Sequence, residues 1–136
     1  MITAVDSNVL LDVFKPDPGS AAASRAALEQ ALQQGGLVAC DIVWAEVAGR
    51  FPSAEHVAKA MSDLGVVFTS LDARSSMSAG ISWGAYMRAG GRRGRLVADF
   101  LVGAHALNQA DRLLTRDRGF YRTYFRKLQI IDPATS

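Results

Sequence analysis

The sequence predicts an α/β protein with a parallel sheet and helices on both of its faces. Short apolar runs typical of buried strands alternate along the chain with longer segments of helical character. The 136 residues are 49% hydrophobic, which predicts one domain, residues 1–136, with a core of its own. Acidic residues follow several of the apolar runs, where open parallel sheets hold their ligands.

The first strand is expected over residues 2–5, because a short apolar run with β-branched residues is typical of a strand buried on both faces. Asp6 ends this strand, and Ser7 or Asn8 can cap the short helix that follows. The same signals predict the next elements: a helix over 21–34 stopped by Gly35 and Gly36, a strand over 37–40, a helix over 42–48 capped by Asp41, and a helix over 54–64 capped by Ser53 and ended at Gly65.

The second half continues the alternation, with a strand over 66–71 and a long helix from the cap Asp72 to about Arg88. The expected apolar stripe of this helix is Met77, Ile81 and Ala85, with Gly80 and Gly84 permitting close packing. A glycine and arginine loop leads to a helix over 96–109, with a stripe of Val97, Leu101, Ala104 and Leu107. The last elements are a strand over 112–115, a short aromatic helix or turn over 120–125, and a strand over 128–131 ended by Pro133.

The composition excludes some classes of protein. No run of 18 or more apolar residues occurs, and the N-terminus lacks the pattern of a secretory signal. The single cysteine, Cys40, cannot form an internal disulfide and lies in an apolar run, where buried packing is expected. These features predict a cytoplasmic protein.

The net charge of +2 conceals a strong asymmetry along the chain. Residues 1–87 carry 5 basic and 9 acidic side chains, a net charge of −4, whereas residues 88–127 carry 10 basic and 3 acidic ones, a net charge of +7. Asp132 adds one further acid. The basic segment suggests a polyanionic substrate, although an arginine-rich solvated surface would show the same pattern.

Four acids differ from the other nine because they adjoin apolar segments. Asp6 follows the first strand, Glu46 lies in the helix after the second, Asp99 begins an apolar helix, and Asp117 follows the strand over 112–115. In a parallel sheet these positions meet at one edge. Four carboxylates repel one another unless a cation is present, and oxygen ligands without a suitable histidine pair favour one or two Mg²⁺ or Mn²⁺ ions. Such ions activate water in phosphodiester hydrolysis.

Each of these acids also has a purely structural interpretation. Asp6 can cap the next helix, Glu46 can face solvent, Asp99 can complement a helix dipole, and Asp117 can be a turn residue. Their positions at corresponding ends of strand–helix units favour a shared site instead. Surface, hydrogen-bonding or packing roles are expected for His56, His105 and Asp12.

Four segments resemble the motifs of PIN-domain ribonucleases, in the same order. They are residues 6–12, 44–47, 98–107 and 113–121, and Ser7 stands where the family more often has threonine. The closing segment, through Pro133, resembles the VapC toxins of bacterial toxin–antitoxin pairs. The resemblance extends over nearly the whole chain.

This resemblance implies a three-layer α/β/α fold with a five-stranded parallel sheet. It also implies a metal-dependent endoribonuclease toxin that is inhibited by a VapB-type antitoxin and forms a homodimer. The catalytic and metal-binding acids carry over to Asp6, Glu46, Asp99 and Asp117. Side chains expected to support these acids are Ser7, Asn8 and Thr115, and the arginines expected to bind RNA are Arg92, Arg93, Arg95, Arg116 and Arg118.

Other functions fit the sequence less well. A haloacid-dehalogenase-like phosphohydrolase would need a second aspartate where Asn8 stands, and a receiver domain would need a late lysine after a strand. Another Mg²⁺-dependent phosphohydrolase would share the carboxylates. A non-catalytic RNA-binding module would explain the arginines but would leave the four acids without a purpose. Cleavage that depends on added Mg²⁺ or Mn²⁺ distinguishes the enzyme from the binding module.

Overall fold

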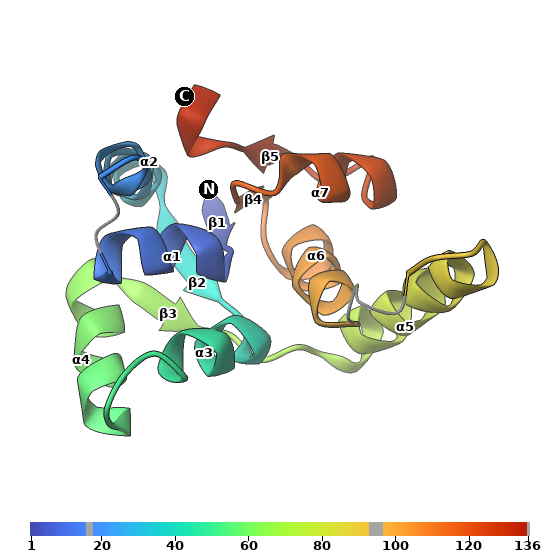
Figure 1. The fold of residues 1–136 in the computed structure, drawn as a ribbon, viewed down its shortest axis with the longest axis horizontal. Helices are drawn as coiled ribbons and strands as arrows, with labels where there is room; N and C mark the ends of the chain where they lie inside the picture. Colours follow the sequence, from blue (N-terminus) through green and yellow to red (C-terminus); the bar gives the residue numbers. More distant parts are fainter. Residues whose placement is uncertain (16–17, 93–96, 136) are drawn as a thin grey trace.

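The computed structural model describes residues 1–15, 18–92 and 97–135, and its strands form one parallel sheet. The strands are β1 (Ile2–Val5), β2 (Gly36–Ala39), β3 (Val66–Phe68), β4 (Arg112–Leu114) and β5 (Ile130–Ile131), in the order β3-β2-β1-β4-β5. Thr3 of β1 lies opposite Leu37 of β2 and Arg112 of β4. The first strand of the chain is therefore the central strand of the sheet (Figure 1).

The described residues form seven α-helices and a short 3₁₀ helix. They are α1 (Ser7–Phe14), α2 (Ala21–Gln34), α3 (Asp41–Ala48), α4 (Ala54–Leu64), α5 (Ala73–Arg88), α6 (Val97–Gln109), α7 (Arg118–Tyr124) and η1 (Pro133–Thr135). Right-handed connections place α1 to α4 on one face of the sheet and α5 to α7 on the other. The three-layer α/β/α architecture with five parallel strands is thus confirmed. None of the described helices is long and apolar enough to cross a membrane.

The core is continuous from the sheet into α6 and α7. Ala4 and Leu113, from the two central strands, are at most 2% exposed, as expected for strands covered on both faces. On the α6 face, the ring of Phe100 contacts Phe120 and Phe125, with centroids 5.1 and 6.1 Å apart. This aromatic cluster fixes α7 against α6 and so positions the segment that follows β4.

The predicted helix caps Ser53 and Asp72 and the predicted helix end at Gly65 are confirmed. Ser53 accepts a hydrogen bond from the backbone N of His56 at 3.3 Å, and Asp72 accepts one from Ser75 at 2.7 Å. Gly65 ends α4 with a φ of 80°, a left-handed conformation that favours glycine.

The prediction that Asp41 caps α3 is wrong, because its side chain bonds to the segment that follows β3. Asp41 is the first residue of α3, and its carboxylate accepts hydrogen bonds from Ser70 Oγ at 3.0 Å and from Leu71 N at 3.3 Å. These bonds hold the chain that leaves β3. The predicted extension of β3 to Leu71 is also wrong, because the strand ends at Phe68.

β1 has the predicted bounds, Ile2–Val5, whereas the bounds of β2, β4 and β5 differ by one or two residues from those predicted. β2 begins one residue earlier than expected, at Gly36, and β4 ends at Leu114. β5 contains Ile130 and Ile131 alone, because Leu128 donates its N–H to the carbonyl of Phe125 in a preceding turn.

The predicted apolar stripes of α5 and α6 are largely wrong. Met77 and Ile81 of α5 are 64% and 71% exposed. In α6, Val97 and Leu107 are exposed, whereas Phe100 and other residues around the helix are buried. The physical reason is that α6 lies between the sheet and α5 and is covered on two sides, while α5 has one face on the outside (Figure 1).

A pair of alanine substitutions should shift the free energy of unfolding in opposite directions. Gly80 lies inside α5, and a Cβ there would meet nothing within 4 Å, so Gly80→Ala should stabilise the protein by about 0.5–1 kcal/mol. Gly65→Ala should destabilise it by about 1 kcal/mol or more, because the left-handed conformation strains an L residue. Urea unfolding measures both changes, and shifts of the same sign would contradict the packing described for α5.

Candidate active site

Asp6 lies at the carboxyl end of the central strand and is 7% exposed. Its Oδ1 accepts a hydrogen bond from the backbone N of Ser7 at 2.8 Å. Its Oδ2 accepts bonds from Thr115 Oγ1 at 2.8 Å and from Tyr121 OH at 3.2 Å. Asp6 itself, and not Ser7 or Asn8, therefore occupies the cap position of α1. The same carboxylate is the most buried member of the predicted acidic site.

The hydroxyl of Thr115 joins three parts of this site. It donates its hydrogen to Asp6 and accepts bonds from the backbone N of Asp117 at 3.0 Å and from Asn8 Nδ2 at 3.5 Å. Thr115 is fully buried, so these partners replace water. Asn8 also accepts a bond from the backbone N of Arg116 at 3.2 Å. Thr115 and Asn8 thereby fix the segment after β4 to the start of α1.

Ser7 connects Asp6 with the acid on α3. Its hydroxyl donates to Glu46 Oε1 at 3.2 Å, while its backbone N–H donates to Asp6. Glu46 lies on α3, the helix that follows β2, and β2 is the neighbour of β1. One serine thus orients carboxylates from two adjacent strand ends.

Three of the predicted acids, Asp6, Glu46 and Asp99, are close enough for their charges to interact. Burial raises the pKa of Asp6, hydrogen bonds from Thr115, Ser7 and Tyr121 partly offset that increase, and the charge of Asp99 raises the pKa further. Partial desolvation raises the pKa of Glu46, with additional contributions from the charges of Asp6 and Asp99.

The hydroxyl of Tyr121 interacts electrostatically with three of the predicted acids. Burial raises the pKa of its hydroxyl above the usual range, and so do the charges of Asp6, Asp99 and Asp117. The hydroxyl therefore keeps its proton and remains a hydrogen-bond donor to Asp6. Sequence reasoning did not single out Tyr121. Its one local signal was the spacing of four residues from Asp117, which places Asp117 at the cap and Tyr121 in the middle of α7.

The structure places the last two acids beside this network. Asp99 is half-buried in the first turn of α6, and Asp117 occupies the cap position of α7 without a capping bond from its side chain. In the part of the chain that is described, no three Asp, Glu, His or Cys side chains are grouped closely enough to hold a metal ion. Coordination by several of the four acids would thus require side-chain rotation.

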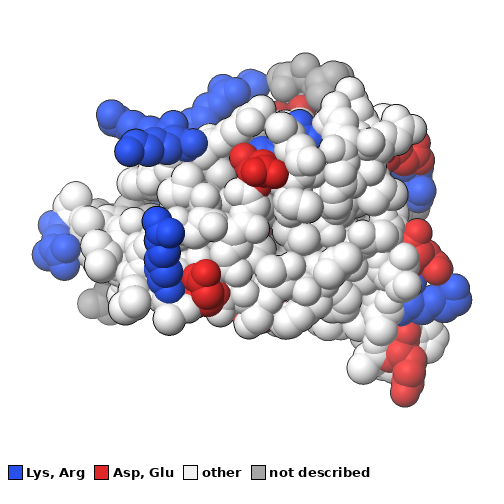
Figure 2. Space-filling view, turned by 180° about the vertical axis from the view of Figure 1, so that it is seen from behind, with Lys and Arg blue, Asp and Glu red and all other residues white. Residues whose placement is uncertain are grey.

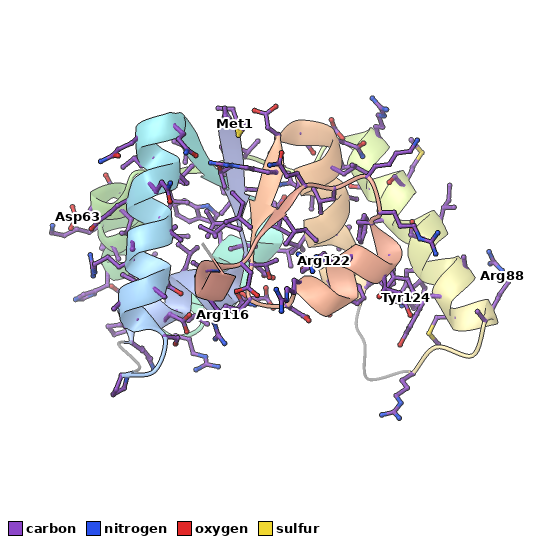
Figure 3. The ribbon with its side chains drawn as sticks, turned by 90° about the horizontal axis from the view of Figure 1, so that it is seen from above. Met1, Asp63, Arg88, Arg116, Arg122 and Tyr124 are labelled. Carbon is purple, nitrogen blue, oxygen red and sulfur yellow. The ribbon has the colours of Figure 1, made fainter. Side chains whose placement is uncertain are left out.

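The predicted RNA-binding arginines have different environments. Arg116 forms a two-point ion pair with Asp12, at 2.7 Å from Nε to Oδ2 and 3.0 Å from Nη2 to Oδ1. Figure 3 shows Arg116 near the middle of the molecule, far from Arg88 at the end of α5. Arg118 lies 3.5 Å from Asp132, and Arg92 is exposed. Arg93 and Arg95 lie outside the described residues.

Three further residues have the structural roles expected of them. Asp12 is 5% exposed and accepts a bond from Ser24 Oγ at 2.7 Å in addition to its pair with Arg116. His105 is 1% exposed, and burial lowers its pKa, as expected for a packed helix residue. Cys40 is buried and free.

Comparisons with known proteins agree with this geometry. The family model described as PIN domain matches residues 3–126. VapBC2 from Rickettsia felis, bound to a promoter DNA fragment, matches with a TM-score of 0.73 and 17% identity, covering 97% of this chain and 98% of the other. VapBC-1 from nontypeable Haemophilus influenzae matches with a TM-score of 0.73 and 22% identity, covering 98% and 99%.

DNA-bound VapBC from Salmonella typhimurium matches with a TM-score of 0.71 and 14% identity, covering 98% of both chains. At these identities the likeness establishes a shared fold. Comparison with curated proteins finds none that matches the sequence.

Replacing Asp6 with asparagine should make the stability of the metal-free protein less dependent on pH. Because the pKa of Asp6 is raised in the folded state, its contribution to the free energy of unfolding is largest below its ordinary pKa of 3.8 and decreases as pH rises through the raised pKa. Between about pH 4 and pH 7, the wild type should therefore lose stability relative to Asp6→Asn. Urea unfolding in EDTA measures the difference.

The exposed Asp63, paired with Lys59 on α4, provides the matched control. Asp63→Asn should follow the wild type at every pH. If Asp6→Asn also followed the wild type throughout, the burial and repulsion described for Asp6 would be refuted.

Proposed function

The chain belongs to the PIN domain family, and on this basis we propose that it is a VapC-like toxin. Its activity is the metal-dependent hydrolysis of phosphodiester bonds within RNA, and a VapB-type antitoxin inhibits it. The observation that carries the proposal is the group of acids around the buried carboxylate of Asp6. The matched structures are themselves VapBC complexes, which supports the antitoxin as partner. We also propose that the toxin forms a homodimer and acts in the cytoplasm.

Members of the PIN domain family generally use divalent metal ions, and the chemistry of this donor set fits such an ion. Asp6, Glu46, Asp99 and Asp117 offer hard carboxylate oxygens, which suit Mg²⁺ or Mn²⁺. One or two such ions would activate a water molecule and stabilise negative charge on the phosphate. Burial is the main cause of the raised pKa values of Asp6 and Glu46, repulsion between the acids adds to it, and a cation would relieve that repulsion.

The hydrogen bonds of Asp6 indicate which of its oxygens is available to a cation. Oδ2 accepts two bonds, from Thr115 and Tyr121, and so uses both of its lone pairs. Oδ1 accepts one bond, from Ser7, and retains a lone pair. We therefore assign metal binding to Oδ1, with Thr115 and Tyr121 holding the carboxylate in a fixed orientation.

The distribution of charge supports a polyanionic substrate. Figure 2 shows Lys and Arg side chains gathered around the end of the molecule that contains α5 and α7, away from most acids visible on that face. Arg116 and Arg118 are already paired with Asp12 and Asp132. Arg92, with Arg93 and Arg95, is therefore the better candidate to contact RNA phosphates. A binding module without catalysis would leave the acidic group unexplained.

Removing a metal ligand should abolish cleavage without unfolding the protein. Asp6→Asn and Asp99→Asn should each lower the rate of single-stranded RNA cleavage about a hundredfold or more, because a bound metal stabilises transition-state charge by several kcal/mol. Antitoxin-free wild type should require Mg²⁺ or Mn²⁺ and stop with EDTA. Asp63→Asn, an exposed acid on α4, should retain full activity. Cleavage that survives chelation, or a fully active Asp99→Asn variant, would place the chemistry elsewhere.

The arginine segment should determine affinity for RNA but not the site of cleavage. Replacing Arg92, Arg93 and Arg95 together with alanine should weaken RNA binding for all sequences, because phosphate contacts carry no sequence information. Each lost contact should flatten the slope of log affinity against log salt by about 0.7 for single-stranded RNA. Binding is measured in an Asp99→Asn background at several salt concentrations.

The matched control for this experiment is Arg116→Ala. Arg116 is held by Asp12, so its replacement should affect stability more than the salt slope. An unchanged slope in the triple variant would show that these arginines do not touch the substrate.

A further inference from the structure

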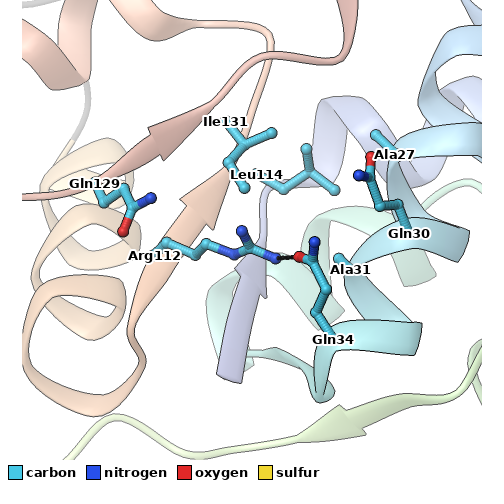
Figure 4. A pocket seen from close by; sticks show the side chains of 8 residues that line it. All are labelled: Ala27, Gln30, Ala31, Gln34, Arg112, Leu114, Gln129 and Ile131. Carbon is cyan, nitrogen blue, oxygen red and sulfur yellow. Dashed lines mark hydrogen bonds between the residues drawn. The ribbon is translucent and has the colours of Figure 1, made fainter. Parts of the chain in front are cut away.

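A cavity lies on the face of the sheet opposite α6 and α7. Its volume is about 240 Å³, and it is bounded by α2 on one side and by β4 and β5 on the other (Figure 4). None of the four acids of the proposed active site lines it. The cavity is therefore a separate site, and the inference below does not rest on the proposed nuclease function.

A buried arginine crosses this cavity. Arg112 of β4 is 7% exposed, and its side chain extends toward Gln34 of α2 (Figure 4). Its Nε donates to Thr3 Oγ1 at 2.9 Å, and its Nη2 donates to Gln34 Oε1. Both acceptors are uncharged. Among the residues that the structure describes, no carboxylate pairs with Arg112, since the adjacent Asp111 accepts the backbone N–H of Ile2 at 2.6 Å instead.

A buried guanidinium without a counter-ion is unfavourable. Arginine side chains stay protonated in proteins, so a buried one keeps its charge and the desolvation penalty of that charge. Buried charges are expected to be paired, and the same chain does this elsewhere, where Asp12 receives two bonds from Arg116. Nη1 of Arg112 has no protein partner within the described chain and can donate to a ligand.

The other walls of the cavity define the ligand more closely. The amide oxygen of Gln34 is occupied by Arg112, so its NH₂ group remains as a donor, and the side-chain amide of Gln129 lies on the opposite wall. Leu114 and Ile131 provide an apolar surface, and none of the acids in the described chain lines the cavity. The volume is below the range of about 300–1,000 Å³ typical for drug-sized ligands, so the occupant must be small.

We propose that this cavity binds a small organic oxyanion, with its phosphate or carboxylate head on Arg112 and a compact apolar body against Leu114 and Ile131. Phosphate and carboxylate share the chemistry that a guanidinium recognises, because both offer oxygens to its parallel N–H groups. The ligand supplies the counter-ion that the described residues do not provide for Arg112.

The test uses the full chain in EDTA, with phenyl phosphate and benzoate as probes and uncharged benzamide as the control. We expect saturable NMR shifts of the Arg112 side-chain N–H and of the Leu114 and Ile131 amides with at least one of the two anions. Comparison of the two affinities identifies the preferred head group. Benzamide should cause no such shifts. Equal binding of benzamide, or no saturable shift with either anion, would overturn the proposal.

Two variants tie the binding to Arg112. Arg112→Met should weaken the affinity about thirtyfold or more, as is typical when one partner of a buried charge pair is removed. Arg122→Met, which removes the same charge from the exposed surface of α7, should leave the affinity unchanged. Unchanged affinity in Arg112→Met would refute the site.

Gln129→Glu keeps Arg112 in place and so tests the proposal even if Arg112→Met does not fold. It puts a carboxylate on the wall of the cavity, where it can serve as the missing counter-ion. This variant should lose anion binding and, without ligand, unfold at a higher urea concentration than the wild type. A variant that still binds both anions as the wild type does would show that they bind elsewhere.

Discussion

The buried carboxylate of Asp6 is the constraint on which the proposed active site depends. It lies at the end of the central strand, where water reaches it poorly, and it accepts bonds from Thr115 and Tyr121, which follow the neighbouring strand β4. These bonds hold the ends of β1, β4 and the start of α7 in one arrangement. Hydrogen bonds to a carboxylate favour its charged form, whereas burial and the charge of Asp99 favour the protonated form of Asp6. The protonation state of Asp6 thus depends on opposing interactions. A cation would shift that balance toward the fully ionised group.

The segment after β4 can support Asp6 because a second buried charge anchors it. Arg116 follows Thr115 directly and forms a two-point pair with Asp12, which Ser24 of α2 also contacts. This pair connects α1, α2 and the loop that leads to Asp117. Asp12 is buried and Arg116 is exposed, so the pair supplies the counter-charge that the buried carboxylate needs. Arg116 therefore serves the site by positioning Thr115, although the sequence alone suggested a contact with RNA.

Local signals in the sequence were sufficient for the features that form within one element. The bounds of α2, the caps Ser53 and Asp72 and the terminating Gly65 follow from neighbouring residues, and the structure has them as predicted. The bonds of Asp41 and the exposed face of α5 could not be predicted in this way, because they depend on segments distant in the sequence. The acids could be located from their places after strands. Tyr121 could not, since its role arises only when α7 folds back over the end of β1.

Some buried charges in this fold have a partner of opposite charge within the described chain, and others do not. The buried carboxylate of Asp12 is paired with the exposed side chain of Arg116, so its burial needs nothing from outside the chain. Asp6 faces other acids at the carboxyl edge of the sheet, and the acceptors of Arg112 among the described residues, on the α2 face, are neutral. Because an uncompensated buried charge is destabilising, each of these two residues indicates a missing partner of opposite sign. The physical argument that assigns a cation to Asp6 thus assigns an anion to Arg112.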